Sequence, residues 1–242
     1  MVNWLLVIGI LICPSPILMK YAAIFSILGV SLILLGCKLE IIGWLFFWSG
    51  ISFSIVGCGY GGLGAKVFGK KSNGSISKLS LSLLLPYLLL TWIVWHIQRW
   101  ISQSSACHQI IPGIWLGRRP FLPELPDNID LIIDLTSEFV EPYNVIARKT
   151  YICIPTLDNS VPPDSSFQKL IEIILSWQGN IYIHCALGYG RSATVVAGIL
   201  LAKGLVDNLD EAEKFIEAKR PGIKLSQEQK SLLKRVFNLA SY

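Results

Sequence analysis

The sequence predicts an α/β fold in its C-terminal part, with a mainly parallel central sheet flanked by helices, preceded by an all-α membrane region of about four helices. Residues 1–98 contain six lysines and one glutamate, whereas residues 99–242 contain 15 basic and 15 acidic residues. Long apolar runs fill the first part, and short β-branched runs alternate with amphipathic helical patterns in the second. We therefore expect a transmembrane helical region at 1–99 and a separate globular domain at 100–242.

The composition narrows the possible partners. Hydrophobic residues make up 52% of the 242 positions and charged residues only 15%, against about 25% charged in an average soluble domain. The net charge of +5 arises entirely in the apolar part, so it indicates lysines beside anionic lipid and not a nucleic-acid-binding surface. The six cysteines show neither CxxC pairs nor zinc-ligand spacing. We expect free thiols in a reducing compartment, no metal and no other cofactor.

Four apolar runs form the expected membrane region. Three of them approach the roughly 20 residues that cross a hydrocarbon core, while the first is shorter and carries two prolines, so it could kink or lie shallow. None has a central acidic residue or arginine, which favours an anchor over a transport path. Five tryptophans suit interfacial belts: Trp44, Trp48, Trp92, Trp95 and Trp100. The four runs are Trp4–Met19, Tyr21–Cys37, Ile41–Gly59 and Leu79–Ile97.

The second part alternates strands with helices, as a mainly parallel sheet requires. We expect the last two helices to be capped by Asn208 or Asp210 and by Ser226 with Gln229. Ligands of such sheets bind at the carboxyl ends of the strands. The expected strands are 113–117, 129–135, 150–155 and 180–185, and the expected helices are 164–177, 192–204, about 209–220 and 226–240.

The stretch HCALGYGRS places a cysteine at the end of a strand and an arginine at the start of a helix. Between them, a glycine-containing loop can turn its backbone N–H groups inward and form an anion cradle beside the helix N-terminus. This field favours the thiolate of Cys185, Arg191 supplies a bidentate fork for phosphoryl oxygens, and Ser192 can hydrogen-bond the sulfur. The pattern indicates phosphoryl transfer. The cradle residues are Ala186, Leu187, Gly188, Tyr189, Gly190 and Arg191.

HCALGYGRS resembles the His-Cys-x5-Arg-Ser/Thr signature of the protein tyrosine phosphatase superfamily, and the short domain resembles its dual-specificity branch. The resemblance covers about residues 108–240, including IPGIWLGRRP and KRPGIKLSQEQKSLLKRV. It implies a dual-specificity-phosphatase-like fold and a catalytic domain at 100–242. It further implies that Cys185 forms a phosphocysteine intermediate and that Arg191 binds phosphate in the ground and transition states.

The family also needs an acid on a loop that follows a strand. In YICIPTLDNSVPPDSS, Asp158 fits this place, and as a carboxylate it could then activate water. Asp164 is the competitor, although it stands where a helix N-cap belongs. The loop lacks the Trp-Pro-Asp of larger tyrosine-specific members, which favours the smaller branch.

Other residues around the signature have supporting or structural interpretations. We expect His184 to be a buried histidine whose ring bonds the loop backbone. Asp134 and Glu138 could buttress the site, although a strand-end acid is more often only a cap. Cys153 could form a reversible disulfide with Cys185 if their strands adjoin; otherwise it packs in the sheet.

The cradle carries no lysine, which argues against a polyphosphorylated inositol head group as the substrate. We expect a phosphomonoester of a protein, as phosphotyrosine or phosphoserine/threonine, or broad specificity. The alternatives are a lipid phosphatase acting on phosphatidylglycerophosphate or a monophosphorylated phosphoinositide, and a membrane protein with a regulatory phosphate-binding module.

The orientation of the multi-pass membrane region carries a conflict. The loop 60–78 has four lysines, which places it in the cytoplasm. If the last apolar run then crosses the bilayer, everything after residue 99 faces outward, whereas a reactive thiol favours the cytoplasm. The conflict disappears if the last run, interrupted by Pro86, is re-entrant or if one lysine-rich loop departs from the positive-inside rule. We expect a cytoplasmic catalytic domain.

Overall fold

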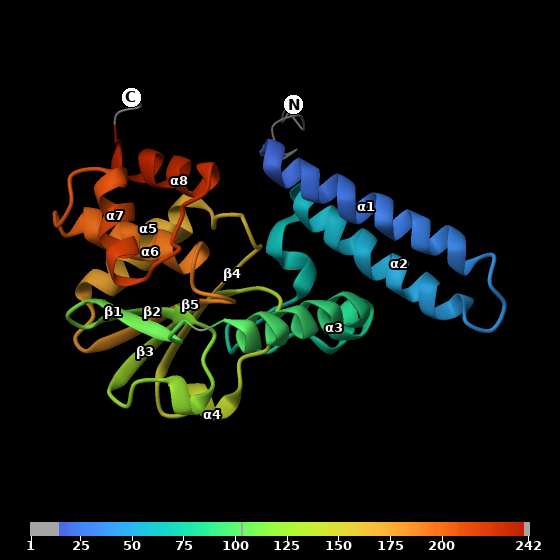
Figure 1. Cartoon of the computed structure of the whole chain (residues 1–242), viewed down its shortest axis with the longest axis horizontal. Coiled ribbons are helices and arrows are strands. Elements are labelled where there is room, and N and C mark those ends of the chain that lie inside the picture. The colour runs from blue at the N-terminus through green and yellow to red at the C-terminus, as the bar shows by residue number, and fades with distance from the viewer. Residues whose placement is uncertain (1–14, 103, 240–242) are drawn as a thin grey trace, which may run out of the picture.

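The computed structural model describes residues 15–102 and 104–239, and its C-terminal part is built around a five-stranded sheet (Figure 1). The order of the strands is β1-β2-β5-β3-β4, with β1 antiparallel to β2 and all other neighbours parallel. The four predicted strands are confirmed, whereas β1 had not been predicted. The strands are β1 (Cys107–Ile111), β2 (Ile114–Arg118), β3 (Ile129–Thr136), β4 (Thr150–Thr156) and β5 (Asn180–Cys185).

Four helices cover one face of this sheet, and each was expected from its periodicity (Figure 1). Leu131, Ile133 and Leu135 alternate along β3 and are fully buried against them. Two predicted caps are present: Asn208 caps α7, and Ser226 with Gln229 forms a capping box on α8. The third is wrong, because Pro163 is the N-cap of α5 and Asp164 is its first helical residue. The helices are α5 (Asp164–Ser176), α6 (Arg191–Ala202), α7 (Leu209–Lys219) and α8 (Gln227–Phe237).

The opposite face of the sheet is covered by short elements and by a segment from the N-terminal region. Helix α4 (Tyr143–Ile146) packs on Ile132 and Tyr182, together with Leu125, which directly follows the 3-10 turn η4 (Leu122–Glu124). At the carboxyl end of the strands, Lys70 reaches this face from the loop that precedes α3. The N-terminal region is therefore part of the wall around this end of the sheet.

The N-terminal region contains three helices that are, by length and composition, apolar enough to cross a membrane among the described residues. Helix α1 (Pro16–Gly36) runs through Lys20, so the end of the first expected apolar run and nearly all of the second form one continuous helix, and the expected break at Lys20 is wrong. Residues 1–14, which hold most of the first run, lie outside the described part. Helix α2 (Gly43–Cys58) continues through a π-helical turn, η2 (Gly59–Leu63), and a 3-10 turn, η3 (Gly64–Phe68). Helix α3 spans Lys78–Ile101.

Helices α1 and α2 form a closely packed antiparallel hairpin that extends away from the sheet (Figure 1). Small residues recur every seven positions on both helices and meet at the contact. A Cβ added at Gly50 would lie 2.6 Å from the Gly29 carbonyl oxygen, and one at Gly43 would clash with the Gly36 carbonyl. Close backbone approach through small residues is the usual means of packing helices in a membrane.

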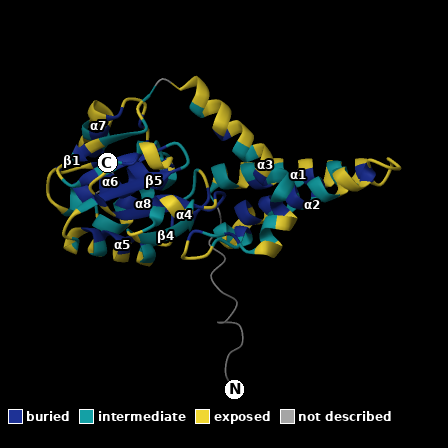
Figure 2. Ribbon diagram, turned by 90° about the horizontal axis from the view of Figure 1, so that it is seen from below, coloured by how far each residue is buried: buried dark blue, intermediate teal, exposed yellow. Residues whose placement is uncertain are grey.

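Helix α3 lies against the C-terminal domain over its second half and remains continuous at Pro86. Proline cannot bond the Ser82 carbonyl, which accepts instead from Trp48 Nε1 at 3.0 Å. Trp92 and Trp95 were expected in an interfacial belt, but they donate to the Glu138 and Ala186 carbonyls of the C-terminal domain. The opposite side of α3 is exposed, as is much of the α1–α2 hairpin (Figure 2).

Candidate active site

The loop between β5 and α6 holds Cys185 at the carboxyl end of the central strand. The thiol is 4% exposed, its Sγ lies 3.3 Å from Ser192 Oγ, and it accepts from the Gly188 N–H at 3.3 Å. The predicted neighbourhood of Cys185, Ser192 and the cradle therefore exists as a compact loop. Its sulfur lies beneath the loop and is contacted by groups that can stabilise negative charge.

The carbonyl oxygens of the loop are bonded from outside it. The Ala186 carbonyl accepts from Trp95 Nε1 at 2.8 Å, and Arg220 donates to the Leu187 and Gly188 carbonyls at 3.0 and 2.9 Å. These bonds hold three carbonyl oxygens toward groups outside the loop, while the Gly188 N–H points to the sulfur of Cys185. The anion cradle stays a prediction that needs the other loop N–H groups to face the same way.

Gly188 is required by the path of the loop. Its φ is +78°, and a Cβ at this position would lie 2.4 Å from the Gly117 carbonyl carbon and oxygen. Both the left-handed backbone and the close approach to β2 exclude a side chain. Tyr189 instead extends outward, where its ring lies under the Arg220 guanidinium at 4.7 Å and its hydroxyl lies 3.0 Å from Ser104 Oγ.

Arg191 is held from below by a carboxylate and two carbonyls. Glu138 contacts its two terminal nitrogens at 2.7 and 3.1 Å, and the Thr156 carbonyl accepts at 2.8 Å. Burial alone would lower the pKa of Arg191, but the charges of Glu138 and Asp158 outweigh it and hold that pKa above its usual value. Its Nε has no hydrogen-bond partner among the described residues. The orientation of the Arg191 guanidinium is therefore fixed, and the group still has an N–H that can donate to an oxyanion.

Asp158 and Asp164 have clearly different positions. Asp158 Oδ1 lies 3.4 Å from the Arg191 guanidinium, and its side chain is 66% exposed at the mouth of the site. Asp164 instead forms an exposed bidentate pair with Arg235, at 2.8 Å to each oxygen. The structure thus brings Asp158, and not its competitor, to Cys185 and Arg191.

A buried charged cluster lies behind the site, on the second face of the sheet. Lys70 Nζ bonds Asp134 Oδ2 at 2.5 Å, and Arg119 bonds Glu141 Oε2 at 3.1 Å. Desolvation favours a neutral Asp134, but the charge of Lys70 outweighs it and lowers the pKa of the carboxyl. Ligand atoms of Asp134, Glu141 and His184 lie within 4.8 Å of one another, as a metal site would need. Both carboxylates are already paired with cations, so the cluster has little need of a metal charge.

His184 is fully buried, and its ring lies against the Cys185 backbone, where the expected bond would form, although neither ring nitrogen makes a hydrogen bond of good geometry among the described residues. Burial is the main cause that lowers the pKa of His184 to about 4, with Asp134 opposing it and Lys70 adding to it. The ring is therefore neutral near pH 7 and acts by packing behind Cys185.

We expect this buried ring to make folding sensitive to acid. Between pH 6.5 and about 4 the unfolded chain binds a proton at His184 and the folded chain does not, so stability is lost as pH falls through this window. The loss should be roughly 3 kcal/mol in total. Thermal unfolding of the full-length protein in detergent would measure it, and His184→Asn should flatten the curve in this range. An unchanged pH dependence in the variant would contradict the assignment.

Several residues of the site were missed or undervalued in the sequence. From the sequence, Glu138 was interpreted mainly as a cap, Lys70 as one lysine of a loop, and Trp95 as an interfacial anchor. Arg220 was noted only as part of an Arg-Pro pair that resembles the family. The disulfide alternative for Cys153 is wrong. Strand β3 separates β4 from β5, which puts the two backbones about 10 Å apart, beyond the reach of a disulfide.

The site opens into a cavity of about 550 Å³. Cys185, Arg191 and Asp158 line it from the C-terminal domain, while aromatic side chains of the N-terminal helices line the remainder. This volume falls within the range of small-molecule sites. The N-terminal region is therefore a structural component of the candidate site.

A family model and the curated relatives that the chain matches all describe dual specificity phosphatases. Residues 123–238 match the family model for the dual specificity phosphatase catalytic domain. Human dual specificity protein phosphatase 4 is 32% identical over 122 residues, which cover 46% of this chain and 30% of the relative. For human dual specificity protein phosphatase 1 the identity is 30%, over 46% of this chain and 32% of the relative. The chain thus spans less than a third of the length of these relatives.

Solved structures share the fold of the C-terminal part. A mutant form of Tk-PTP aligns with a TM-score of 0.50 and 24% identity, covering 55% of this chain and 95% of that one. The family model matches residues 123–238, and the two relatives and the Tk-PTP structure each align with only about half of this chain. The family match therefore concerns the sheet domain. The role of α1 to α3 has to be inferred from the contacts that these helices make.

Proposed function

We propose that this chain, whose residues 123–238 belong to the dual-specificity phosphatase branch of the protein tyrosine phosphatase superfamily, is a membrane-anchored phosphatase that works through a phosphocysteine intermediate. The observation that carries the proposal is the convergence of Cys185, Arg191 and Asp158 on one cavity at the carboxyl end of β5. A thiolate, a fixed guanidinium and an ionisable carboxyl are the groups that this chemistry requires.

In the first step the phosphate binds in the loop, with two of its oxygens on Arg191. The Cys185 thiolate attacks phosphorus, a P–S bond forms, and the P–O bond to the substrate breaks. Asp158 donates its proton to the leaving oxygen, so the alcohol departs neutral. A phosphate bound beside Arg191 would share that guanidinium with the Asp158 carboxyl group, whose Oδ1 lies 3.4 Å from it.

In the second step water attacks the phosphocysteine. The Asp158 carboxylate accepts a proton from this water, the P–S bond breaks, and inorganic phosphate is released. The Ser192 hydroxyl, 3.3 Å from the sulfur, can donate to the departing thiolate. The cycle is then complete, because thiolate and protonated Asp158 are restored.

The contacts of the lysine-rich loop support an arrangement in which this loop and the catalytic domain lie on the same side of the membrane. Lys70 bonds Asp134, and the Gly74 carbonyl accepts from the Glu141 N–H at 3.0 Å, so both ends of α3 lie beside the C-terminal domain. Helix α3 would then lie along the membrane surface, while the α1–α2 hairpin enters the bilayer. This arrangement removes the conflict in the topology, because the lysine-rich loop and the catalytic domain share the cytoplasmic side.

The phosphocysteine can be tested directly. The full-length protein in detergent is mixed with ³²P-labelled phosphomonoester and quenched in acid, and the labelled peptide is sequenced. We expect label on Cys185, because the sulfur is the group beneath the loop. Label that never appears while product accumulates would contradict the mechanism, and binding without product would instead support a regulatory phosphate-binding module.

A further inference from the structure

We propose that the cavity beside Cys185 binds the apolar chain of a membrane lipid that carries one phosphomonoester. This inference rests on the proposed phosphatase function and specifies its substrate class. The phosphate of such a lipid would lie in the loop above Cys185, and its chain would lie among α1, α2 and α3. Hydrolysis would release the lipid alcohol and inorganic phosphate.

The cavity has two chemically different parts. Its polar part comes from the C-terminal domain and includes Cys185, Arg191 and Asp158. Its other part is formed by the N-terminal region, where aromatic rings dominate. A mostly apolar pocket with a few converging polar groups is the usual form of a small-molecule site. The aromatic lining consists of Tyr21, Phe25, Phe53, Tyr60, Phe68 and Tyr87.

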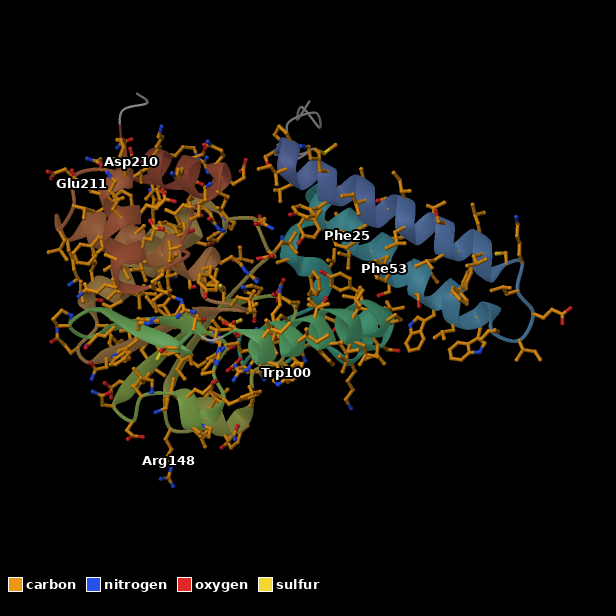
Figure 3. The ribbon with its side chains drawn as sticks, in the orientation of Figure 1. Phe25, Phe53, Trp100, Arg148, Asp210 and Glu211 are labelled. Atoms are coloured by element: carbon orange, nitrogen blue, oxygen red, sulfur yellow. The ribbon has the colours of Figure 1, made fainter. Side chains whose placement is uncertain are left out.

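These rings pack against one another and form a continuous wall. Phe25 lies 5.6 Å from Tyr60 and 6.1 Å from Phe53, and both phenylalanines contact Tyr87 of α3 edge-on at 5.6 Å. Phe25 and Phe53 lie on the part of the hairpin that faces α3 (Figure 3). Such ring packing is stabilising in itself, so the wall is preorganised for an apolar chain.

The aromatic wall is joined to the reacting groups. Asn159, next to Asp158, donates to the Tyr21 hydroxyl of α1 at 3.2 Å. Trp95 of α3 donates to the Ala186 carbonyl of the cradle. The helices that carry the wall therefore contact both the loop that holds Asp158 and the loop that holds Cys185. A substrate bound beside Cys185 would lie next to these helices.

The cavity reaches an exposed apolar surface of α3. Leu90 and Val94 line the cavity and are 50% and 44% exposed, and Ile93 and Ile97 continue the apolar surface along the same helix. Exposed apolar surface of this extent indicates contact with a membrane or another apolar partner. A lipid could thus reach the site from the bilayer past Leu90 and Val94 without passing through water.

The charges favour one phosphate and disfavour a peptide. Among the described residues that line the cavity, Arg191 and the exposed Lys224 are the only ones with cationic side chains, and Glu138 and Asp158 oppose further negative charge. A phosphopeptide would place backbone N–H and C=O groups against the aromatic wall, where few partners are available. An alkyl chain has no such requirement.

The test is a series of n-alkyl phosphates, from ethyl to octyl, with the full-length protein in detergent below the aggregation limit of each ester. All have the same primary-alcohol leaving group, so only the buried chain changes. We expect kcat/KM to rise up to about fourfold per buried methylene. A flat series, with a phosphotyrosine peptide hydrolysed faster than octyl phosphate, would overturn the lipid proposal in favour of a protein substrate.

A matched pair of variants separates the cavity from partition into detergent. Val94→Trp fills the opening, whereas Ile93→Trp adds the same ring on the same helix at a residue that does not line the cavity. The octyl-to-ethyl ratio of kcat/KM should fall at least tenfold in Val94→Trp and remain at the wild-type value in Ile93→Trp. Equal ratios in the two variants would show that partition alone caused the preference and would overturn the proposal.

The two levels of the proposal fail differently. If the phosphatase function is wrong, neither alkyl phosphates nor p-nitrophenyl phosphate is hydrolysed in a Cys185-dependent manner. If only the lipid assignment is wrong, p-nitrophenyl phosphate is hydrolysed with dependence on Cys185 while chain length has no effect.

Discussion

Replacing Cys185 with serine is expected to lower kcat for every phosphomonoester by about 10⁴-fold or more. The hydroxyl of serine is not ionised near neutral pH, so the nucleophile would be lost although its volume hardly changes. The loop should survive, because its carbonyls are bonded by Trp95 and Arg220 and not by the sulfur. Release of phosphate from p-nitrophenyl phosphate by the full-length protein in detergent measures the effect.

Cys107→Ser provides the matched control. Cys107 lies in β1, is free and half-buried, and does not line the cavity. The same chemical change there should leave kcat within about twofold, since it affects no group near the phosphate. Full turnover by Cys185→Ser would exclude the phosphocysteine route, and equal losses in both variants would indicate a general effect on folding.

Replacing Asp158 with alanine is expected to have an effect that depends on the leaving group. An alkyl alcohol must be protonated as it departs, so kcat for octyl phosphate should fall by about 10²- to 10³-fold. p-Nitrophenolate is a stable anion, and the loss for p-nitrophenyl phosphate should be less than tenfold. Measuring both substrates with one preparation gives a ratio that is independent of the fraction of folded protein.

Asp164→Asn is the control for this prediction. Asp164 is paired with Arg235 on the surface, and an exposed pair contributes little to stability. Both substrates should therefore be hydrolysed at nearly the wild-type rate. An equal loss for both leaving groups in Asp158→Ala would exclude Asp158 as the acid, and a leaving-group-dependent loss in Asp164→Asn would move that role to Asp164.

The lipid cavity changes how the N-terminal region is interpreted. From the sequence, residues 1–99 were expected to act as an anchor for the C-terminal domain. Trp95 and Lys70 instead bond groups of the C-terminal domain at the edge of the site. We therefore expect the substrate preference of the proposed phosphatase to depend on its own helices as well as on the loop around Cys185.

The local elements of the protein could be predicted from the sequence. The stretch from Cys185 to Arg191 spans seven residues, so the strand, the glycine-containing turn and the helix start are all visible along the chain. The same holds for the capping box of Ser226 and Gln229. These features depend on backbone preferences and periodicity within a few residues, which a single sequence carries.

The partners of these elements were decided only by the tertiary structure. Glu138 meets Arg191 across 53 positions, Lys70 meets Asp134 across 64, and Trp95 meets Ala186 across 91. Periodicity shows that a helix has an apolar side but does not show what covers that side. A tryptophan near a helix end looks the same in the sequence whether it contacts lipid or another domain. Which of these forms depends on how whole elements pack, and that packing created the cavity.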